Sequence, residues 1–308
     1  MAASPLDLDD YRTAIALNQP FVPSARPAGP RQQDEAARTA LTALLRERAV
    51  DDLGVTPDSA ANLTARQTRR ALRVALNLRA PGPRPEGVDV ALDALLGGER
   101  ETRGIVDAAA LATIAETHPS TGYAAADSTV LWQGDMTTLA ADAVVNAANS
   151  RLLGCFRPLH SCIDNALHSA AGPRLRDDCA TIMALQRGAE RTGAAKITRG
   201  YQLPARMVLH TVGPVVDGAL TTEHERLLAQ AYRSCLDVAA DTGDVRSVAF
   251  CSLSTGVFGF PKLPAARIAL ATVADWMASH PGRLDRVVFD VWARSDLAVY
   301  EQALTGER

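Results

Sequence analysis

Apolar positions change their spacing near residue 120 of the 308-residue chain. Before this point they recur three or four positions apart, a spacing typical of amphipathic helices, over 34–50, 63–78, 88–96 and 107–116. This half shows no strand-like alternation of apolar and polar residues. We therefore predict a helical N-terminal region that covers residues 1–120.

After residue 120, short apolar runs alternate with segments of helical spacing. The runs are 129–132, 143–145, 207–209, 247–251 and 287–292, and the helical segments are 173–186, 222–240, 264–279 and 296–304. Strands that alternate with helices of this length indicate an α/β layered domain with a largely parallel or mixed sheet. We predict that this domain covers residues 121–308 and binds its ligand at the carboxyl ends of the strands.

Composition excludes several classes of protein. The 32 Lys and Arg residues against 35 Asp and Glu residues leave a formal net charge of -3, which argues against general nucleic-acid binding. The sequence contains no run of about 18 apolar residues, the length that could span a membrane. The first ten residues carry aspartates where a secretory signal would be positively charged, so we expect a cytoplasmic protein.

Three candidate metal ligands lie within eight residues, namely Cys155, His160 and Cys162. Thiolates and imidazole suit zinc, and three protein ligands without an obvious fourth are typical of an open, catalytic zinc site. Cys179 could be a fourth ligand, but its helical surroundings favour the core. The alternative is that these thiols and the histidine bind no metal.

Two asparagines end the apolar run that precedes this cluster. The amides of Asn146 and Asn149 offer donors and acceptors that could hold the hydroxyls of a sugar. The alternative at Asn149 is a simple turn.

A glycine- and hydroxyl-rich loop at 252–261 connects a predicted strand to a predicted helix. In such a loop the backbone N–H groups can converge on an anion, so this one suits a diphosphate. It lacks the ending of a P-loop and a full dinucleotide fingerprint. An ordinary strand-to-helix turn would have similar residues.

Two further residues fit a nucleotide. Asp135 could accept a hydrogen bond from an exocyclic amine, or it could cap a short helix. The ring of Trp292 could stack on a base, or it could pack in the core.

Taken together, these residues resemble the macrodomain family, whose members bind ADP-ribose. The resemblance covers about residues 128–304 and depends on five motifs, which are 134–137, 145–149, 170–172, 210–214 and 254–259. The glycine-rich stretch of most macrodomains is replaced here by 154–165, which is similar to the zinc-containing microbial branch of protein-ADP-ribose hydrolases. The resemblance implies a three-layer α/β/α fold with a mixed central sheet, after a helical N-terminal extension.

The resemblance also implies roles for single residues. Asp164 stands where hydrolytic macrodomains place their catalytic carboxylate, and Asn149 stands at the position of the distal-ribose asparagine. Asp135 would hold the adenine amine, and Trp292 would flank the base. The expected ligand contacts are Asp135, Met136, Asn146, Asn149, Ser254, Thr255, Gly256, Val257, Phe258 and Trp292.

The resulting hypothesis is a zinc-dependent hydrolase, with one zinc ion per chain, that removes mono-ADP-ribose from modified proteins. Its partners would be ADP-ribose and the modified protein, and the linkage would be an ester to an acidic side chain. Two alternatives remain. One is a reader that binds ADP-ribose without cleaving it, and the other is a hydrolase of a free ADP-ribose derivative with a structural zinc.

Overall fold

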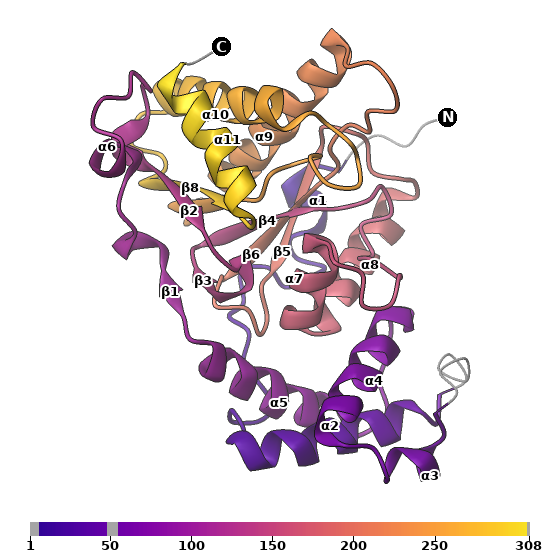
Figure 1. Cartoon of the computed structure of the whole chain (residues 1–308). Coiled ribbons are helices and arrows are strands. Elements are labelled where there is room, and N and C mark those ends of the chain that lie inside the picture. Colours follow the sequence, from indigo (N-terminus) through magenta and orange to yellow (C-terminus); the bar gives the residue numbers. More distant parts are fainter. Residues whose placement is uncertain (1–5, 48–54, 307–308) are drawn as a thin grey trace.

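The computed structural model describes residues 6–47 and 55–306. A six-stranded sheet lies at its centre in the strand order β2-β8-β7-β4-β6-β5 (Figure 1). All neighbours are parallel except β5, which runs antiparallel to β6. The strands are β2 (Thr129–Gln133), β4 (Ala143–Ala147), β5 (Ala195–Arg199), β6 (Met207–Thr211), β7 (Ser247–Phe250) and β8 (Arg286–Val291). The mixed sheet confirms the prediction.

Helices cover both faces of this sheet, which gives the three-layer α/β/α arrangement that was expected (Figure 1). One layer contains α9 (Thr222–Thr242), α10 (Lys262–Ser279) and α11 (Arg294–Thr305), which pack on one another. The other contains α7 (Ile163–Ala171) and α8 (Arg174–Gln186). None of the helices within 6–47 and 55–306 is long and apolar enough to cross a membrane.

The N-terminal region is helical and has a small core of its own. Its helices are α1 (Leu8–Tyr11), α2 (Pro30–Leu44), α3 (Pro57–Ala60), α4 (Ala65–Leu78) and α5 (Val88–Arg103). Leucines and alanines of α2, α4 and α5 form a buried cluster separate from the main core. By contrast, Leu8 and Tyr11 belong to the main core, and the Tyr11 hydroxyl accepts a hydrogen bond from the Ile197 backbone N–H at 2.9 Å. The division at residue 120 stays a prediction.

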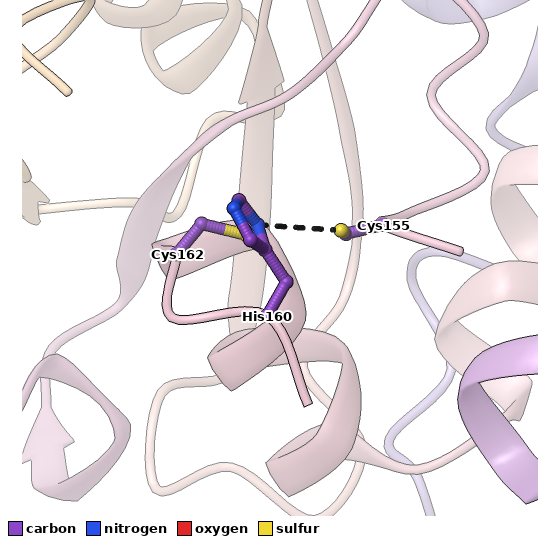
Figure 2. Close-up of side chains that lie close together, drawn as sticks. All are labelled: Cys155, His160 and Cys162. Atoms are coloured by element: carbon purple, nitrogen blue, oxygen red, sulfur yellow. Dashed lines mark hydrogen bonds between the residues drawn. The ribbon is translucent and has the colours of Figure 1, made fainter. Parts of the chain in front are cut away.

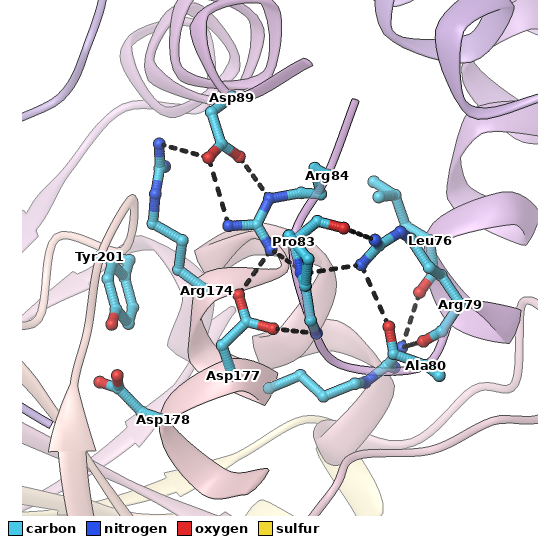
Figure 3. Close-up of polar contacts among 12 residues, drawn as sticks. Leu76, Arg79, Ala80, Pro83, Arg84, Asp89, Arg174, Asp177, Asp178 and Tyr201 are labelled. Carbon is cyan, nitrogen blue, oxygen red and sulfur yellow. Dashed lines mark hydrogen bonds and ion pairs between the residues drawn. The ribbon is translucent and has the colours of Figure 1, made fainter. Parts of the chain in front are cut away.

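Charged side chains tie this helical region to α8 (Figure 3). Arg84 bonds both Asp89 and Asp177, and the second Asp177 oxygen accepts the Gly82 N–H at 2.9 Å. Arg174 of α8 reaches back to Asp93 of α5 at 2.7 Å. The Arg84 guanidinium and the Asp93 carboxylate are nearly buried, so these pairs fix how the two parts lie against each other.

Four details of the chain differ from the sequence-based expectation. The fourth N-terminal helix, expected over 107–116, is wrong: β1 (Val106–Asp107) pairs with β3 (Leu139–Ala140), a 3₁₀ turn follows, and α6 spans only Ile114–Thr117. Asp107 caps the 3₁₀ turn and Thr113 caps α6, so two short helical turns begin separately where one helix was expected. Strand β5 and helix α7 were not expected. The helix expected over 34–50 ends at Leu44, and 48–50 lie outside the described residues.

Candidate active site

The predicted site residues gather at one edge of the sheet. Strands β2, β4, β7 and β8 are connected through parallel pairs, so the loops that follow them leave from the same edge. Asp135, the segment 146–149, the loop 254–258 and Trp292 follow these four strands in turn. The sheet thereby brings together residues that are more than 150 positions apart in the sequence, such as Asp135 and Trp292.

Asp164 is the carboxylate at the centre of this edge. It lies in the first turn of α7, is 5% exposed, and accepts a hydrogen bond from the Asn146 amide at 2.8 Å. Burial raises the pKa of Asp164 to about 6, although the Asn146 bond and the positive charge of Arg176 lower it. Asn146 itself is completely buried, so its side chain positions Asp164 from beneath.

Two buried histidines underlie this carboxylate. His168 Nε2 lies 3.4 Å from Asp164 Oδ1, and His210 Nδ1 lies 3.2 Å from the Asn146 amide. Burial lowers the pKa of both imidazoles, that of His210 to about 3, so both are neutral. Cys179 Sγ contacts His210 Nε2 at 3.7 Å in the same buried layer. Cys179 is buried, as its helical surroundings indicated, and it forms with His168 and His210 a second group whose ligand atoms lie within 4.8 Å of one another.

Asn149 forms the turn that the sequence left as an alternative. Its side-chain Oδ1 accepts the Arg151 N–H at 3.0 Å, and its side-chain Nδ2 donates to the Gly154 carbonyl at 3.1 Å. The amide nitrogen also lies 3.5 Å from the second oxygen of Asp164. Asn149 therefore joins the end of β4 both to Asp164 and to the start of residues 154–162, the cysteine-containing loop.

The three candidate metal ligands come together in that loop. Cys155, His160 and Cys162 bring their ligand atoms within 4.8 Å of one another, and Cys155 Sγ lies 3.6 Å from His160 Nδ1 (Figure 2). Cys162 is the N-cap of α7, two positions before Asp164. Burial raises the pKa of the Cys162 thiol to about 12, so its ionisation requires a nearby cation. Two thiols and one imidazole fit zinc.

The loop between β7 and α10 presents unused backbone donors. Within the part of the chain that the structure describes, the N–H groups of residues 255–258 have no hydrogen-bond acceptor. Gly256 and Val257 are exposed, whereas Ser254 is buried with a left-handed φ of 62°. Ser254 Oγ approaches Gly213 so closely that a Cβ there would lie 2.0 Å away. Four free donors before a helix N-terminus are an arrangement that can receive an anion.

The two predicted adenine contacts lie beside each other at the far side of this edge. Asp135 caps a 3₁₀ turn, because its Oδ1 accepts from the Thr137 N–H at 2.9 Å and from the Thr137 hydroxyl at 2.7 Å. Met136, by contrast, is buried in the main core, so only its backbone can face a ligand. Trp292 is 74% exposed, which rules out the core role that the sequence left open.

Helix α4 holds the cysteine-containing loop, which sequence reasoning missed. The Asn77 amide oxygen accepts both the Leu159 N–H and the Asn165 amide at 3.0 Å. Arg73 donates to Asn165 at 2.8 Å. The sequence of α4 carries no signal for this role, because Asn77 and Arg73 occur at spacings that ordinary helix residues also have.

Known proteins resemble this chain over the same region. The family model for the Macro domain matches residues 145–269. The chain is 50% identical over 192 residues to the Protein-ADP-ribose hydrolase of Treponema medium, which covers 62% of this chain and 72% of the relative. It is 48% identical to the Protein-ADP-ribose hydrolase of Staphylococcus aureus over 58% of this chain and 66% of that protein.

A solved structure gives the same result for the fold. The crystal structure of the Trypanosoma brucei macrodomain in complex with ADP-ribose superimposes with a TM-score of 0.55 at 39% identity, over 64% of this chain and 76% of that one. The region matched by the family model contains Asp164, the cysteine-containing loop and the loop of residues 254–258. The chain belongs to the macrodomain family.

Proposed function

We propose that this chain is a zinc-dependent hydrolase that releases mono-ADP-ribose from modified proteins. The observation that carries the proposal is the position of Asp164. This nearly buried carboxylate is fixed by Asn146 and stands two residues after Cys162 in a group of three zinc-type ligands. The relatives named Protein-ADP-ribose hydrolase from Treponema medium and Staphylococcus aureus support the hydrolysis of protein-linked ADP-ribose.

The ligand would lie across the edge of the sheet described above. The free N–H groups of residues 255–258 would receive the diphosphate. Asp135 still has one carboxylate oxygen without a partner among the described residues, and this oxygen would accept the adenine amine. The exposed Trp292 ring would stack on the base. These contacts put the distal ribose near Asn149 and Asp164.

Cleavage at the anomeric carbon of the distal ribose builds positive charge on the sugar and requires an oriented water. Asp164 would hold that water and take its proton, because its second oxygen faces Asn149 while its first is occupied by Asn146. Asn149 would hold the ribose hydroxyls beside it. Asn146, His168 and His210 act only through Asp164, as the buried layer that keeps the carboxylate in place.

Cys155, His160 and Cys162 would hold the zinc ion. Bound there, zinc would supply a Lewis acid for a ribose hydroxyl or water. Two thiolates would neutralise the formal charge of the ion, so we expect positioning of the sugar to be its larger contribution. We further propose that the bond cleaved is an ester to an acidic side chain of the modified protein.

A panel of mono-ADP-ribosylated acceptors tests this proposal. Acceptors linked through an acidic side chain, a serine and an arginine are incubated with the purified chain, and free ADP-ribose is quantified. We expect release from the ester only, with Asp241→Asn as an exposed-carboxylate control that retains the rate. Binding of ADP-ribose without release from any acceptor would establish a reader instead. Release only from free, small ADP-ribose derivatives would move the zinc group to a structural role.

A further inference from the structure

A cavity of about 520 Å³ lies between the N-terminal helices and the macrodomain. One wall consists of α4 and α5, and the other is the outer face of α7, which Ala166, Ser169 and Ala170 line. Its size is that of a site for a small organic molecule. Helix α4 approaches α7 in Figure 1, so the cavity depends on the N-terminal region being present.

The α4 wall of this cavity carries an unusual density of arginine. Four of them follow the spacing of one helix face, and Arg103 of α5 adds a fifth, against the two carboxylates Glu99 and Asp135. The four are Arg66, Arg69, Arg70 and Arg73. Because the whole chain carries a net charge of -3, this concentration of positive charge is local and attracts anions into the cavity.

Part of that positive charge has no partner in the protein. Arg69 pairs with Glu99 at 2.5 Å, and Arg73 bonds Asn165 while its Nε is buried without a hydrogen-bond partner. Arg66 and Arg70 are exposed to the cavity side and form no ion pair or hydrogen bond with the residues of 6–47 and 55–306. The cavity therefore offers at least two free guanidinium groups and one unused buried donor.

The cavity meets the proposed ADP-ribose site at its adenosine end, and Leu159 of the cysteine-containing loop also lines it. Asp135 and Trp292, the proposed adenine contacts, line it together with Thr137. None of residues 254–258, which would hold the diphosphate, lines it. The arginines of α4 therefore share a cavity with the proposed adenine contacts but not with the loop 254–258.

We propose that this arginine-lined cavity is a second anion subsite that takes a phosphate carried on the adenosine side of ADP-ribose. Guanidinium groups suit phosphate because their parallel N–H donors match two phosphate oxygens. The inference rests on the proposed function, since it assumes that adenine lies at Asp135 and Trp292. It adds a specificity that the ADP-ribose contacts themselves do not supply.

Two ligands carry this chemistry. One is ADP-ribose with a phosphomonoester on the adenosine ribose, and the other is a second ADP-ribose unit attached there. Binding of ADP-ribose, ADP-ribose 2′-phosphate and an ADP-ribose dimer to the full chain, measured by calorimetry at low and moderate salt, separates them. We expect at least one phosphorylated ligand to bind about tenfold more tightly than ADP-ribose, with a preference that decreases as salt increases.

The double variant Arg66→Gln/Arg70→Gln identifies the subsite. Both side chains are exposed and unpaired among the described residues, so the fold should be retained, which thermal melting checks. We expect the preference to fall to within about twofold of unity, while the affinity for ADP-ribose changes much less. The matched control Arg31→Gln/Arg46→Gln removes the same charge from exposed positions outside the cavity and should keep the preference.

Three results would overturn the inference. Equal affinity of the wild-type chain for all three ligands would show that the cavity adds no phosphate contact. Equal losses for all three ligands in the double variant would show that the arginines serve the diphosphate of ADP-ribose itself. A preference that survives the double variant would place the phosphate elsewhere. Failure of ADP-ribose itself to bind would instead contradict the proposed function.

Discussion

Asn165 at the start of α7 donates a hydrogen bond of 3.0 Å to Asn77 of α4, 88 positions earlier in the chain. Asn77 also accepts the backbone N–H of Leu159, so one amide oxygen holds both the cysteine-containing loop and the helix that carries Asp164. Asn77 is 2% exposed, so these hydrogen bonds lie away from bulk water. The N-terminal region is thus a structural support of the candidate active site.

The first prediction concerns this support. Asn77→Ala removes the acceptor of the half-buried Leu159 N–H and one of the two acceptors of the Asn165 amide, and a donor left unsatisfied costs about 1–3 kcal/mol. We expect a lower melting temperature and zinc that a chelator removes about tenfold more readily. Asn62→Ala, an exposed asparagine shortly before α4, serves as the control. Unchanged zinc retention in a folded Asn77→Ala variant would show that α4 does not support the metal ligands.

The second prediction separates catalysis from binding. Asp164→Asn keeps the shape of the side chain but removes the group proposed to take a proton from water, a contribution typically of about 10²–10⁴ in rate. We expect the turnover of a mono-ADP-ribosylated ester to fall by at least about 100-fold. The Kd for ADP-ribose, measured by calorimetry, should change by less than about threefold. A variant with nearly normal turnover would remove Asp164 from the chemistry.

Trp292 provides the third prediction. Because its ring is mostly exposed, Trp292→Ala removes little packing and should leave the melting temperature within about 1 °C. Loss of stacking on adenine, worth about 1–3 kcal/mol per base, should raise the Kd for ADP-ribose about tenfold or more. Leu185→Ala changes an exposed apolar side chain on α8 and should leave the Kd unchanged. Equal affinities of wild type and Trp292→Ala would place the adenine elsewhere.

The fourth prediction concerns stability and pH. Burial, with a smaller contribution from the charge of Asp135, raises the pKa of Asp290 on β8 to about 8. Between about pH 4 and pH 8 the folded chain therefore keeps a proton that the unfolded chain has lost, so this group costs stability progressively as pH rises.

Asp290→Asn imitates the protonated side chain and removes that dependence. The free energy of unfolding of the variant should exceed that of wild type by an amount that grows by on the order of 2–3 kcal/mol from pH 5 to pH 8. Denaturant unfolding at each pH measures this difference. Asp241→Asn, at an exposed position, should follow the wild-type profile. A gain that is the same at pH 5 and pH 8 would mean that Asp290 does not titrate in this range.

The layered fold could be predicted from the sequence because buried parallel strands are short continuous apolar runs. Strand β5 was missed because its sequence is not a continuous apolar run. Its Lys196 is buried and pairs with Glu190 at 2.8 Å, so a charged residue occupies a core position that no periodicity would assign to it. The segment 107–116 failed for the opposite reason: its apolar spacing is helical, but Asp107 and Thr113 cap two separate short turns.

The candidate site could be predicted from the residues only where its members are close together in the sequence. Cys155, His160 and Cys162 stand within eight residues, so their spacing already indicated a metal group, and the geometry brings them together. The hydrogen bond between Asn146 and Asp164 spans 18 residues and a buried layer, and only the resemblance pointed to that carboxylate. In the sequence, the spacing of the α4 arginines is that of an ordinary solvated helix face. Only the structure shows that α7 lies opposite them across a cavity.

The central claim is that a metal held by Cys155, His160 and Cys162 is needed for the release of ADP-ribose. The most direct measurement is ADP-ribose release from an ester-linked mono-ADP-ribosylated protein by the chain as purified, after zinc removal with a chelator, and after zinc is returned. Cys162→Ala is measured alongside. We predict that release disappears with the metal, returns with zinc in the wild-type chain, and does not return in the variant. Full activity of a folded, metal-free chain would contradict the account.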